Sequence, residues 1–315
     1  MTPAEILAAL AEPAPAPGAY VLRDLSFEDY LRDPVACGSI SSSGAKRLLP
    51  PHCPAAYRWY ADNPQPPKKE YDLGHAAHEL LLGTGSGLVV VDADSWRTTK
   101  AQDAKKAAYA AGRTPLLTKD MAEVEAMVAA VRAHPEAGPL LDPASGDSEQ
   151  TLIWFDDDAG VWRRARLDRV LERGFGERVV IVDLKTTVRA DPDSAGKAMA
   201  AFGYDQQAAW YLDAAAACGL DPVGPGAGGP DVYLLVMVEK SPPYLTAVYR
   251  LPEEVLQRGR VRNRKALAVY RRCMESGWWP GYNDDRTAWL DSPAWAARQH
   301  DDAAARGDYD VEDTP

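Results

Sequence analysis

A short run of Val and Ile residues, 179–182, ends abruptly in a carboxylate, Asp183, with a cation two residues later at Lys185. A run this short and this rich in β-branched residues predicts a strand covered on both faces, as in the middle of a sheet. Because side chains alternate along a strand, Asp183 and Lys185 are expected on the same face. A carboxylate directly after a buried strand is costly unless it is paired or metal-bound. The chain is therefore expected to have a charged site at the end of a central strand.

The neighbouring segments supply the rest of a mixed α/β domain. Residues 151–172 predict two strands joined by an Asp-Asp-Asp-Ala-Gly turn, and this places Asp168 on the strand before the central one. Two later strands are expected at 231–240 and 244–251. Helical periodicity covers 71–82, 119–134, 196–218 and 251–274.

Composition sets the broad class and the division of the chain. Of the 315 residues, 46% are hydrophobic and 26% are charged, which is typical of a soluble globular protein. No apolar run approaches the roughly 18 residues of a membrane span, so no membrane contact and a cytoplasmic location are expected. The four cysteines are scattered and predict reduced thiols. We expect an N-terminal helix and Pro/Ala-rich linker at 1–37, one main domain at 38–282, and an acidic, flexible tail at 283–315.

Two carboxylates and a cation on adjacent strands suggest phosphodiester chemistry. Asp168 and Asp183 offer the hard oxygen ligands that Mg²⁺ or Mn²⁺ prefers, and the Leu184 carbonyl could add another. Lys185 would place a positive charge beside them. The simpler alternative is an ion pair in a β-hairpin, because Asp-x-Lys alone is a weak signal.

Two helices add further polar residues. His75, His78 and Glu79 share part of one helix surface in the segment Leu-Gly-His-Ala-Ala-His-Glu. The order is not the His-Glu-x-x-His of zinc proteases, and a packing histidine is the ordinary interpretation of an isolated one. Gln207 and Tyr211, four residues apart, could reach the site from the helix that follows the central strand.

Taken in order, these elements resemble the RecB-type branch of the PD-(D/E)XK nuclease superfamily. The matching motifs are Gly74…His78, Asp168, Asp183-Leu184-Lys185 and Gln207…Tyr211. The segments 39–60 and 233–259 also resemble the RecE-type (exonuclease VIII-like) phage and prophage exonucleases. The resemblance covers roughly 38–282 and implies a PD-(D/E)XK core: a central mixed sheet flanked by helices, with a helical N-terminal part.

The resemblance also implies roles for individual residues. The groups implied to bind the metal are His78, Asp168, Asp183 and the Leu184 carbonyl. Lys185 would position or help to deprotonate the attacking water and stabilise the charge that develops on the phosphate. Gln207 and Tyr211 would support the site or contact DNA, and Glu149 matches an acidic position often seen at the start of the hairpin.

Three arginines are candidates for DNA contact. Many RecB-type sequences have glycine two residues before the motif aspartate, whereas this chain has Arg166, which RecE-type sequences tolerate. Arg166 could therefore contact a phosphate. Arg260 and Arg264 belong to a basic stretch in the 251–274 helix, where a local cationic strip suits a phosphate backbone despite the net charge of −11.

The resemblance implies a Mg²⁺- or Mn²⁺-dependent DNA exonuclease that acts 5′→3′ on double-stranded ends and leaves 3′ single strands for recombination. It further implies a RecT-type single-strand annealing protein as a partner and a ring-shaped homo-oligomer.

Three alternatives remain open at the level of sequence. One is an endonuclease or a single-strand nuclease on the same fold. Another is a non-catalytic DNA-binding recombination scaffold. The third is a zinc-binding structural protein that uses His75, His78 and a cysteine.

Overall fold

The chain forms two compact units, Met1–Trp279 and Pro280–Pro315. The computed structural model describes residues 1–63, 72–85, 87–171, 178–220 and 232–309.

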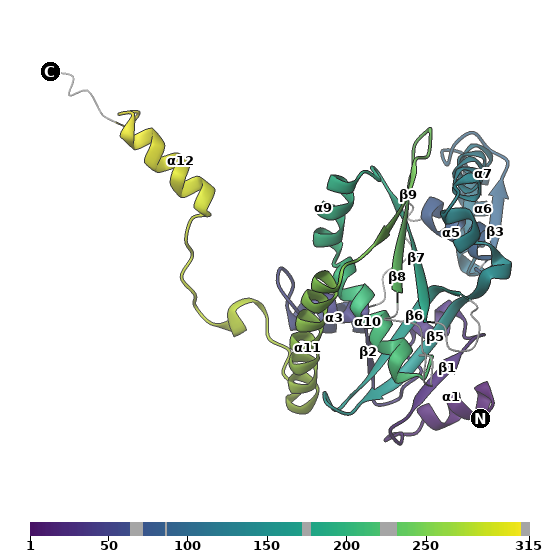
Figure 1. Ribbon diagram of the computed structural model, residues 1–315, viewed down its shortest axis with the longest axis horizontal. Helices are drawn as coiled ribbons and strands as arrows, with labels where there is room; N and C mark the ends of the chain where they lie inside the picture. The colour runs from purple at the N-terminus through teal and green to yellow at the C-terminus, as the bar shows by residue number, and fades with distance from the viewer. Residues whose placement is uncertain (64–71, 86, 172–177, 221–231, 310–315) are drawn as a thin grey trace. The chain divides into compact units, whose positions relative to one another are not determined.

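A mixed sheet forms the centre of the first unit (Figure 1). Within the described residues it has seven strands in the order β1-β5-β6-β7-β8-β9, with β2 paired to β6. β5, β6 and β7 form an antiparallel meander, whereas β7 and β8 are parallel. The strands are β1 (Ala19–Leu22), β2 (Ser39–Ser41), β5 (Gly146–Asp156), β6 (Val161–Leu171), β7 (Val180–Thr187), β8 (Val232–Glu239) and β9 (Thr246–Arg250).

Helices cover both faces of this sheet, and β3 (Leu88–Val91) pairs in parallel with β4 (Thr114–Leu117) beside it. The helices of the first unit are α1 (Pro3–Leu10), α2 (Phe27–Leu31), α3 (Ser42–Arg47), α4 (Pro54–Asp62), α5 (Asp72–Leu82), α6 (Thr99–Ala110), α7 (Thr118–Ala133), α8 (Ala137–Leu140), α9 (Pro192–Phe202), α10 (Tyr204–Ala217) and α11 (Glu253–Ser276).

Strand β7 is buried on both faces, as its apolar run predicts. Ile181 packs into a cluster with Trp210 of α10, on the side that α3, α10 and α11 cover. Val182 and Leu184 point the other way, into a cluster with Leu81 of α5 and Val128 of α7. Figure 1 shows these two helical layers on opposite sides of the sheet. The prediction of a central strand is confirmed. Alternate side chains of β7 point toward the helices on each side of the sheet.

The expected hairpin and the long C-terminal helix of the domain are also present. One predicted helix, 196–218, is instead two, because Gly203 adopts φ +63° between α9 and α10. The left-handed conformation of Gly203 turns the chain between the two helices. At the start of α9, Asp191 caps the helix by accepting a hydrogen bond from the Ser194 amide. The sequence analysis did not predict β1, α2, or the β3–α6–β4 segment.

The N-terminal segment packs onto the sheet. In α1, Ile6 and Leu10 are buried in a cluster that includes Leu22 and Trp162. β1 pairs with β5, with Ala19 opposite Trp154. A strand of four residues is too short to show a periodic pattern in the sequence, so β1 is identified only by its pairing with β5.

The second unit contains α12 (Ala294–Ala305), in the segment where the acidity of the sequence predicts a flexible tail. The alanines of this segment favour a helix, although its acidic composition predicts a flexible chain. Among the described helices of the chain, none combines the length and the hydropathy of a membrane span.

Candidate active site

The site forms where β6 and β7 separate. The two strands pair at Arg169↔Val182 and Val170↔Ile181. At the residue of β6 before these pairs, the Asp168 side chain bonds to β7 in place of the backbone: its Oδ2 accepts a hydrogen bond from the Leu184 amide at 2.9 Å. The Asp168 carboxylate is thus held by the backbone of β7 at the point where the ladder opens.

Helix α5 brings His78 to the same place. Its Nε2 lies 2.8 Å from the Leu184 carbonyl oxygen, and its Nδ1 lies 3.7 Å from Asp168 Oδ2. A carbonyl can only accept, so the proton of this hydrogen bond belongs to Nε2. In a neutral ring, the Nδ1 lone pair then remains available to a cation. Gly74, one turn earlier, permits the approach, because a Cβ there would lie 3.1 Å from Thr186 Oγ1 of β7.

Glu149 completes a cluster of three ligands. It lies on β5 opposite Asp168 of β6, between the paired positions Ser148↔Arg169 and Gln150↔Leu167. Ligand atoms of His78, Glu149 and Asp168 all lie within 4.8 Å of one another. The backbone of Glu149 has φ +55°, a conformation that costs a glutamate free energy and is concentrated at functional sites.

Asp183 and Lys185 lie on the face of β7 that packs against α10, whereas Val182 and Leu184 point to the other face. Asp183 has no exposed side-chain surface, and the Lys185 ammonium is paired with its Oδ2. Burial raises the pKa of Asp183, and the nearby Asp168 raises it further, while Lys185 opposes both. Burial alone would lower the pKa of Lys185, but Asp183 and Asp168 outweigh it and raise this pKa. Lys185 is therefore protonated at neutral pH.

Gln207 and Tyr211 hold Asp183 in place. The Gln207 Nε2 donates to Asp183 Oδ1 at 2.7 Å and lies 3.2 Å from the Tyr211 hydroxyl oxygen. All three side chains are buried. In this geometry Gln207 and Tyr211 position the carboxylate and do not reach out toward a substrate.

Lys46 of α3 is a site residue that the sequence analysis missed. Its Nζ donates to the Phe202 carbonyl at 2.9 Å and to Gln207 Oε1 at 3.4 Å. Burial, together with repulsion from Lys185, lowers its pKa to about 8. The sequence indicates only that Lys46 belongs to a helix capped by Ser41. The sequence around α3 does not indicate that this helix packs near β7.

The predicted DNA-contacting arginines are mostly engaged within the protein. Arg166 pairs with Glu149 and donates to the Leu25 carbonyl at 2.7 Å. Contact with DNA would require Arg166 to exchange these partners.

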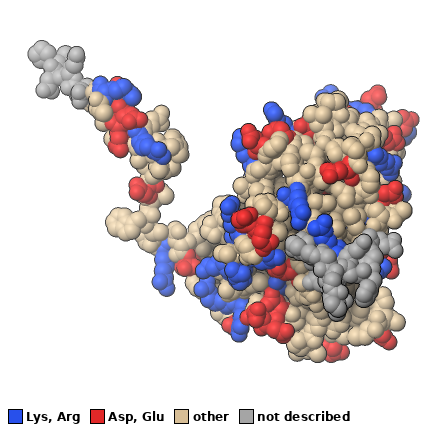
Figure 2. Space-filling view, in the orientation of Figure 1, with Lys and Arg blue, Asp and Glu red and all other residues tan. Residues whose placement is uncertain are grey.

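On α11, Arg260 pairs with Asp213 and Glu253, whereas Arg264 is exposed and has no ion pair among the described residues. Figure 2 shows basic and acidic side chains interspersed over the region of α11, so this surface is less basic than its arginines alone suggest.

The donor set suits a divalent cation. An imidazole nitrogen and carboxylate oxygens from three separate elements converge, and this mixed nitrogen and oxygen donor set can hold a divalent cation. Burial and the neighbouring Asp168 raise the pKa of Glu149, and a bound cation would relieve that clustering of negative charge. Asp183 is not part of this three-residue cluster, and the Leu184 carbonyl lies 2.8 Å from His78 Nε2, so metal ligation by these two groups stays a prediction.

The described residues give little support to the zinc alternative. The cluster contains neither His75 nor a cysteine. Cys53 and Cys273 are buried, Cys218 is half-buried, and Cys37 is exposed.

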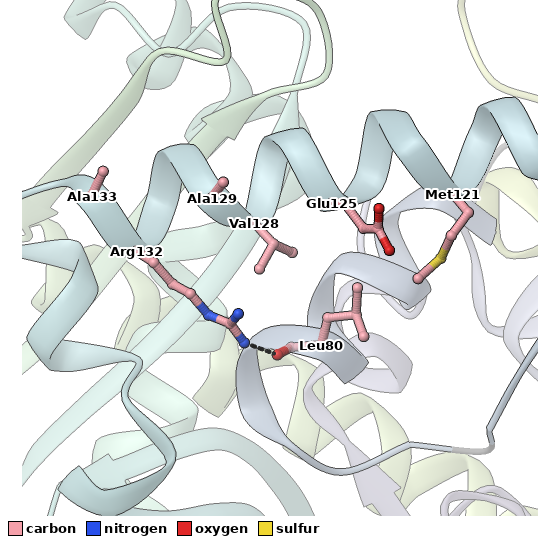
Figure 3. Close-up of a pocket in the computed structure, with 7 residues that line it drawn as sticks. All are labelled: Leu80, Met121, Glu125, Val128, Ala129, Arg132 and Ala133. Carbon is pink, nitrogen blue, oxygen red and sulfur yellow. Dashed lines mark hydrogen bonds between the residues drawn. The ribbon is translucent and has the colours of Figure 1, made fainter.

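A surface groove of about 590 Å³ lies elsewhere, between α5 and α7 (Figure 3). The Arg132 guanidinium crosses it and donates to the Leu80 carbonyl at 2.8 Å. The lining residues Met121, Glu125 and Val128 lie on α7, and none of the ligand cluster belongs to this groove.

The sheet, its helical layers and the motif positions define a PD-(D/E)XK nuclease-like fold. The chain belongs to the family described as "PDDEXK-like domain of unknown function (DUF3799)", whose model matches residues 41–287. A solved structure of a proposed exonuclease from Eubacterium rectale is similar, with a TM-score of 0.56 and 13% identity over 87% of this chain and 98% of that chain. At this identity the likeness shows the fold alone. No curated protein sequence matches the chain. The predicted fold class and superfamily are confirmed.

Proposed function

We propose that this protein is a divalent-metal-dependent DNA exonuclease that hydrolyses phosphodiester bonds at double-stranded ends. The supporting observation is the convergence of His78, Glu149 and Asp168 within 4.8 Å, beside the Asp183–Lys185 pair. A plain structural ion pair would need neither the three-ligand cluster nor the left-handed Glu149.

In the proposed reaction, the metal ligands and the two lysines would have different roles. A bound Mg²⁺ or Mn²⁺ would supply Lewis-acid stabilisation of charge on the phosphate. His78, Glu149 and Asp168 would hold that ion. Lys185, kept protonated by Asp183, would stabilise negative charge that develops on the phosphate, and its raised pKa favours this role over that of a base. Lys46 would provide a second positive charge from α3.

The test is a time course on end-labelled duplex DNA with Mg²⁺, with Mn²⁺ and with a chelator. We expect hydrolysis only with metal, and a loss of about 100-fold or more in rate for Lys185→Met. The matched control is Asp147→Asn, which removes a half-exposed carboxylate on β5 that pairs with Arg23. Hydrolysis that persists in chelator, or that survives Lys185→Met undiminished, would contradict the proposal.

A second substrate separates the exonuclease from its rivals. Covalently closed circular DNA has no ends, so an exonuclease should leave it intact while it degrades the linear form. Rapid cutting of the circle would favour an endonuclease on the same fold. Binding of DNA ends without hydrolysis under any metal would favour a non-catalytic scaffold.

The polarity, 5′→3′, the 3′ single-stranded product, the ring-shaped oligomer and a RecT-type annealing partner are proposals that rest on the sequence resemblance to RecE-type enzymes. Labelling the duplex at either the 5′ or the 3′ end in the same time course reports the polarity.

A further inference from the structure

Large aromatic side chains are exposed on α4 and at the end of α9. Trp59 is 53% exposed, Tyr60 40% and Phe202 61%. Single exposed aromatic side chains are ordinary, but several of them near a proposed active site indicate a surface that binds a ligand or a partner.

A chain of ring contacts connects one end of this group to the site. The Lys185 Nζ lies 5.6 Å from the centre of the Tyr204 ring, and Lys46 Nζ lies 6.0 Å from the same ring. Tyr204 in turn stacks on Phe202, with 5.8 Å between ring centres. The exposed Phe202 is therefore two ring contacts away from the lysine of the Asp183–Lys185 pair.

Helix α3 connects the other end. Arg47 follows Lys46 directly, and its guanidinium lies 4.7 Å from the centre of the Tyr60 ring. Tyr60 packs edge-on against Trp59, with 5.0 Å between ring centres. Two sets of rings and cations, one with Lys46 and one with Arg47, therefore meet at consecutive residues of α3. We name this set the aromatic–cationic surface: Lys46, Arg47, Trp59, Tyr60, Phe202 and Tyr204.

The cations of this surface lack acidic partners. Within the described residues neither Lys46 nor Arg47 forms an ion pair, and Lys46 donates only to the neutral Phe202 carbonyl and Gln207 amide. Arg58, the next cation on α4, is paired with Asp62 and serves as a contrast. Two unneutralised cations among exposed rings complement a ligand that has both negative charge and flat apolar faces.

We propose that the aromatic–cationic surface binds single-stranded DNA and guides an unpaired strand end toward the active site. A single strand offers base faces for stacking and phosphates for the cations, and such stacking is tolerant of sequence. In a duplex the bases are stacked on each other, so their faces are hidden from these rings. The inference rests on the proposed nuclease function for its substrate, DNA, and adds which form of DNA the surface selects.

The test measures binding by the full chain in chelator, so that no hydrolysis occurs. Fluorescence anisotropy compares labelled oligothymidine with a duplex closed by hairpins at both ends. We expect the wild type to prefer oligothymidine. The double variant Trp59→Ala, Tyr60→Ala should weaken oligothymidine binding by about tenfold or more and leave duplex binding nearly unchanged.

The control is Trp289→Ala, which removes a fully exposed tryptophan from the second unit and should bind oligothymidine like the wild type. Circular dichroism and thermal unfolding check that the double variant folds. Unchanged oligothymidine affinity in a folded double variant would overturn the proposal. An equal loss for the closed duplex would overturn it too, because the surface would then bind double-stranded DNA.

Failure here is separable from failure of the proposed function. Metal-dependent hydrolysis with no effect of the double variant on oligothymidine binding overturns the binding surface and leaves the nuclease intact. Absence of hydrolysis, with oligothymidine binding that depends on Trp59 and Tyr60, supports the surface and rejects the nuclease.

Discussion

Glu149 shows how one residue combines strain with chemistry. Its φ of +55° is a conformation that costs a non-glycine residue about 1–3 kcal/mol, yet it brings the carboxylate beside Asp168 and His78. Arg166, on the paired strand, holds the same carboxylate. The backbone conformation that is unfavourable for the strand is the one that completes the ligand cluster.

Replacing Glu149 by Gln should weaken Mn²⁺ binding about tenfold or more, because a charged ligand becomes neutral at constant size. Isothermal titration calorimetry of the full chain measures this directly. Asp147→Asn, two residues earlier on β5, changes the net charge equally and should bind Mn²⁺ like the wild type. Equal affinities for wild type and Glu149→Gln would exclude Glu149 from the metal site.

If Lys46 contacts DNA as proposed, binding should depend on pH. Burial and the neighbouring Lys185 lower the pKa of Lys46 to about 8, so its positive charge is present below that pH and lost as pH rises through it. Oligothymidine affinity should therefore fall by about tenfold across this range, as a charge-assisted contact is lost. In Lys46→Arg, which stays charged, the affinity should not vary in this way. Parallel pH profiles for the two proteins would rule out a role for the Lys46 charge.

At the scale of elements, the break between α9 and α10 decides where Gln207 lies. The two helices follow each other without a loop, and Gly203 alone provides the turn. α10 then runs against β7 with Gln207 facing Asp183. A single continuous helix over 196–218 would direct this face differently.

Substituting Gly203 by Ala should lower the free energy of unfolding by roughly 1–2 kcal/mol, because φ +63° is unfavourable for an L-residue with a Cβ. Gly196→Ala is a control of opposite sign: it lies inside α9 with nothing within 4 Å of an added Cβ, and should stabilise by about 0.5–1 kcal/mol. Urea denaturation measures both. If both substitutions stabilise the protein, the turn at Gly203 does not need glycine.

At the scale of the whole molecule, a net charge of −11 coexists with a proposed function on DNA. The cations proposed to contact DNA are few: within the described residues, Lys46 and Arg47 of α3 form no ion pair, and Lys46 contacts the neutral Phe202 carbonyl and Gln207 amide. Much of the remaining basic charge, as on α11, is neutralised by pairs such as Arg262–Asp205 and Arg271–Glu275. We therefore expect DNA binding to depend on where positive charge is left unpaired, and not on the net charge of the chain.

Removing residues 288–315 should leave the unfolding midpoint of the first unit within about 2 °C of the full chain, since these residues belong to the second unit. It should also leave the rate of hydrolysis of linear duplex DNA unchanged. Differential scanning calorimetry and the end-labelled time course measure the two quantities. A large loss of thermal stability would show that the two units depend on each other.

Local pattern was enough for the five longest strands, β5 to β9, and for placing Asp183 and Lys185 on one face of β7. Val179 to Val182 predict a buried strand, and alternation then fixes the side of each following residue. The fold class followed from the order of such elements. These features depend on residues close together in the chain, so the sequence expresses them directly.

What only the tertiary structure decided are the encounters between distant segments. Lys46 lies more than a hundred residues before Gln207, and no periodicity reports that they meet. In the sequence Glu149 is one acidic residue at the start of a hairpin, and its left-handed backbone places it beside His78 and Asp168. Arg166, a candidate for DNA contact, pairs with Glu149. The sequence by itself determined which side chains β7 carries, among them Asp183 and Lys185. The packing of α3, α5 and α10 around that strand decided which of the other groups reach it, because contacts between elements depend on how whole helices and strands pack.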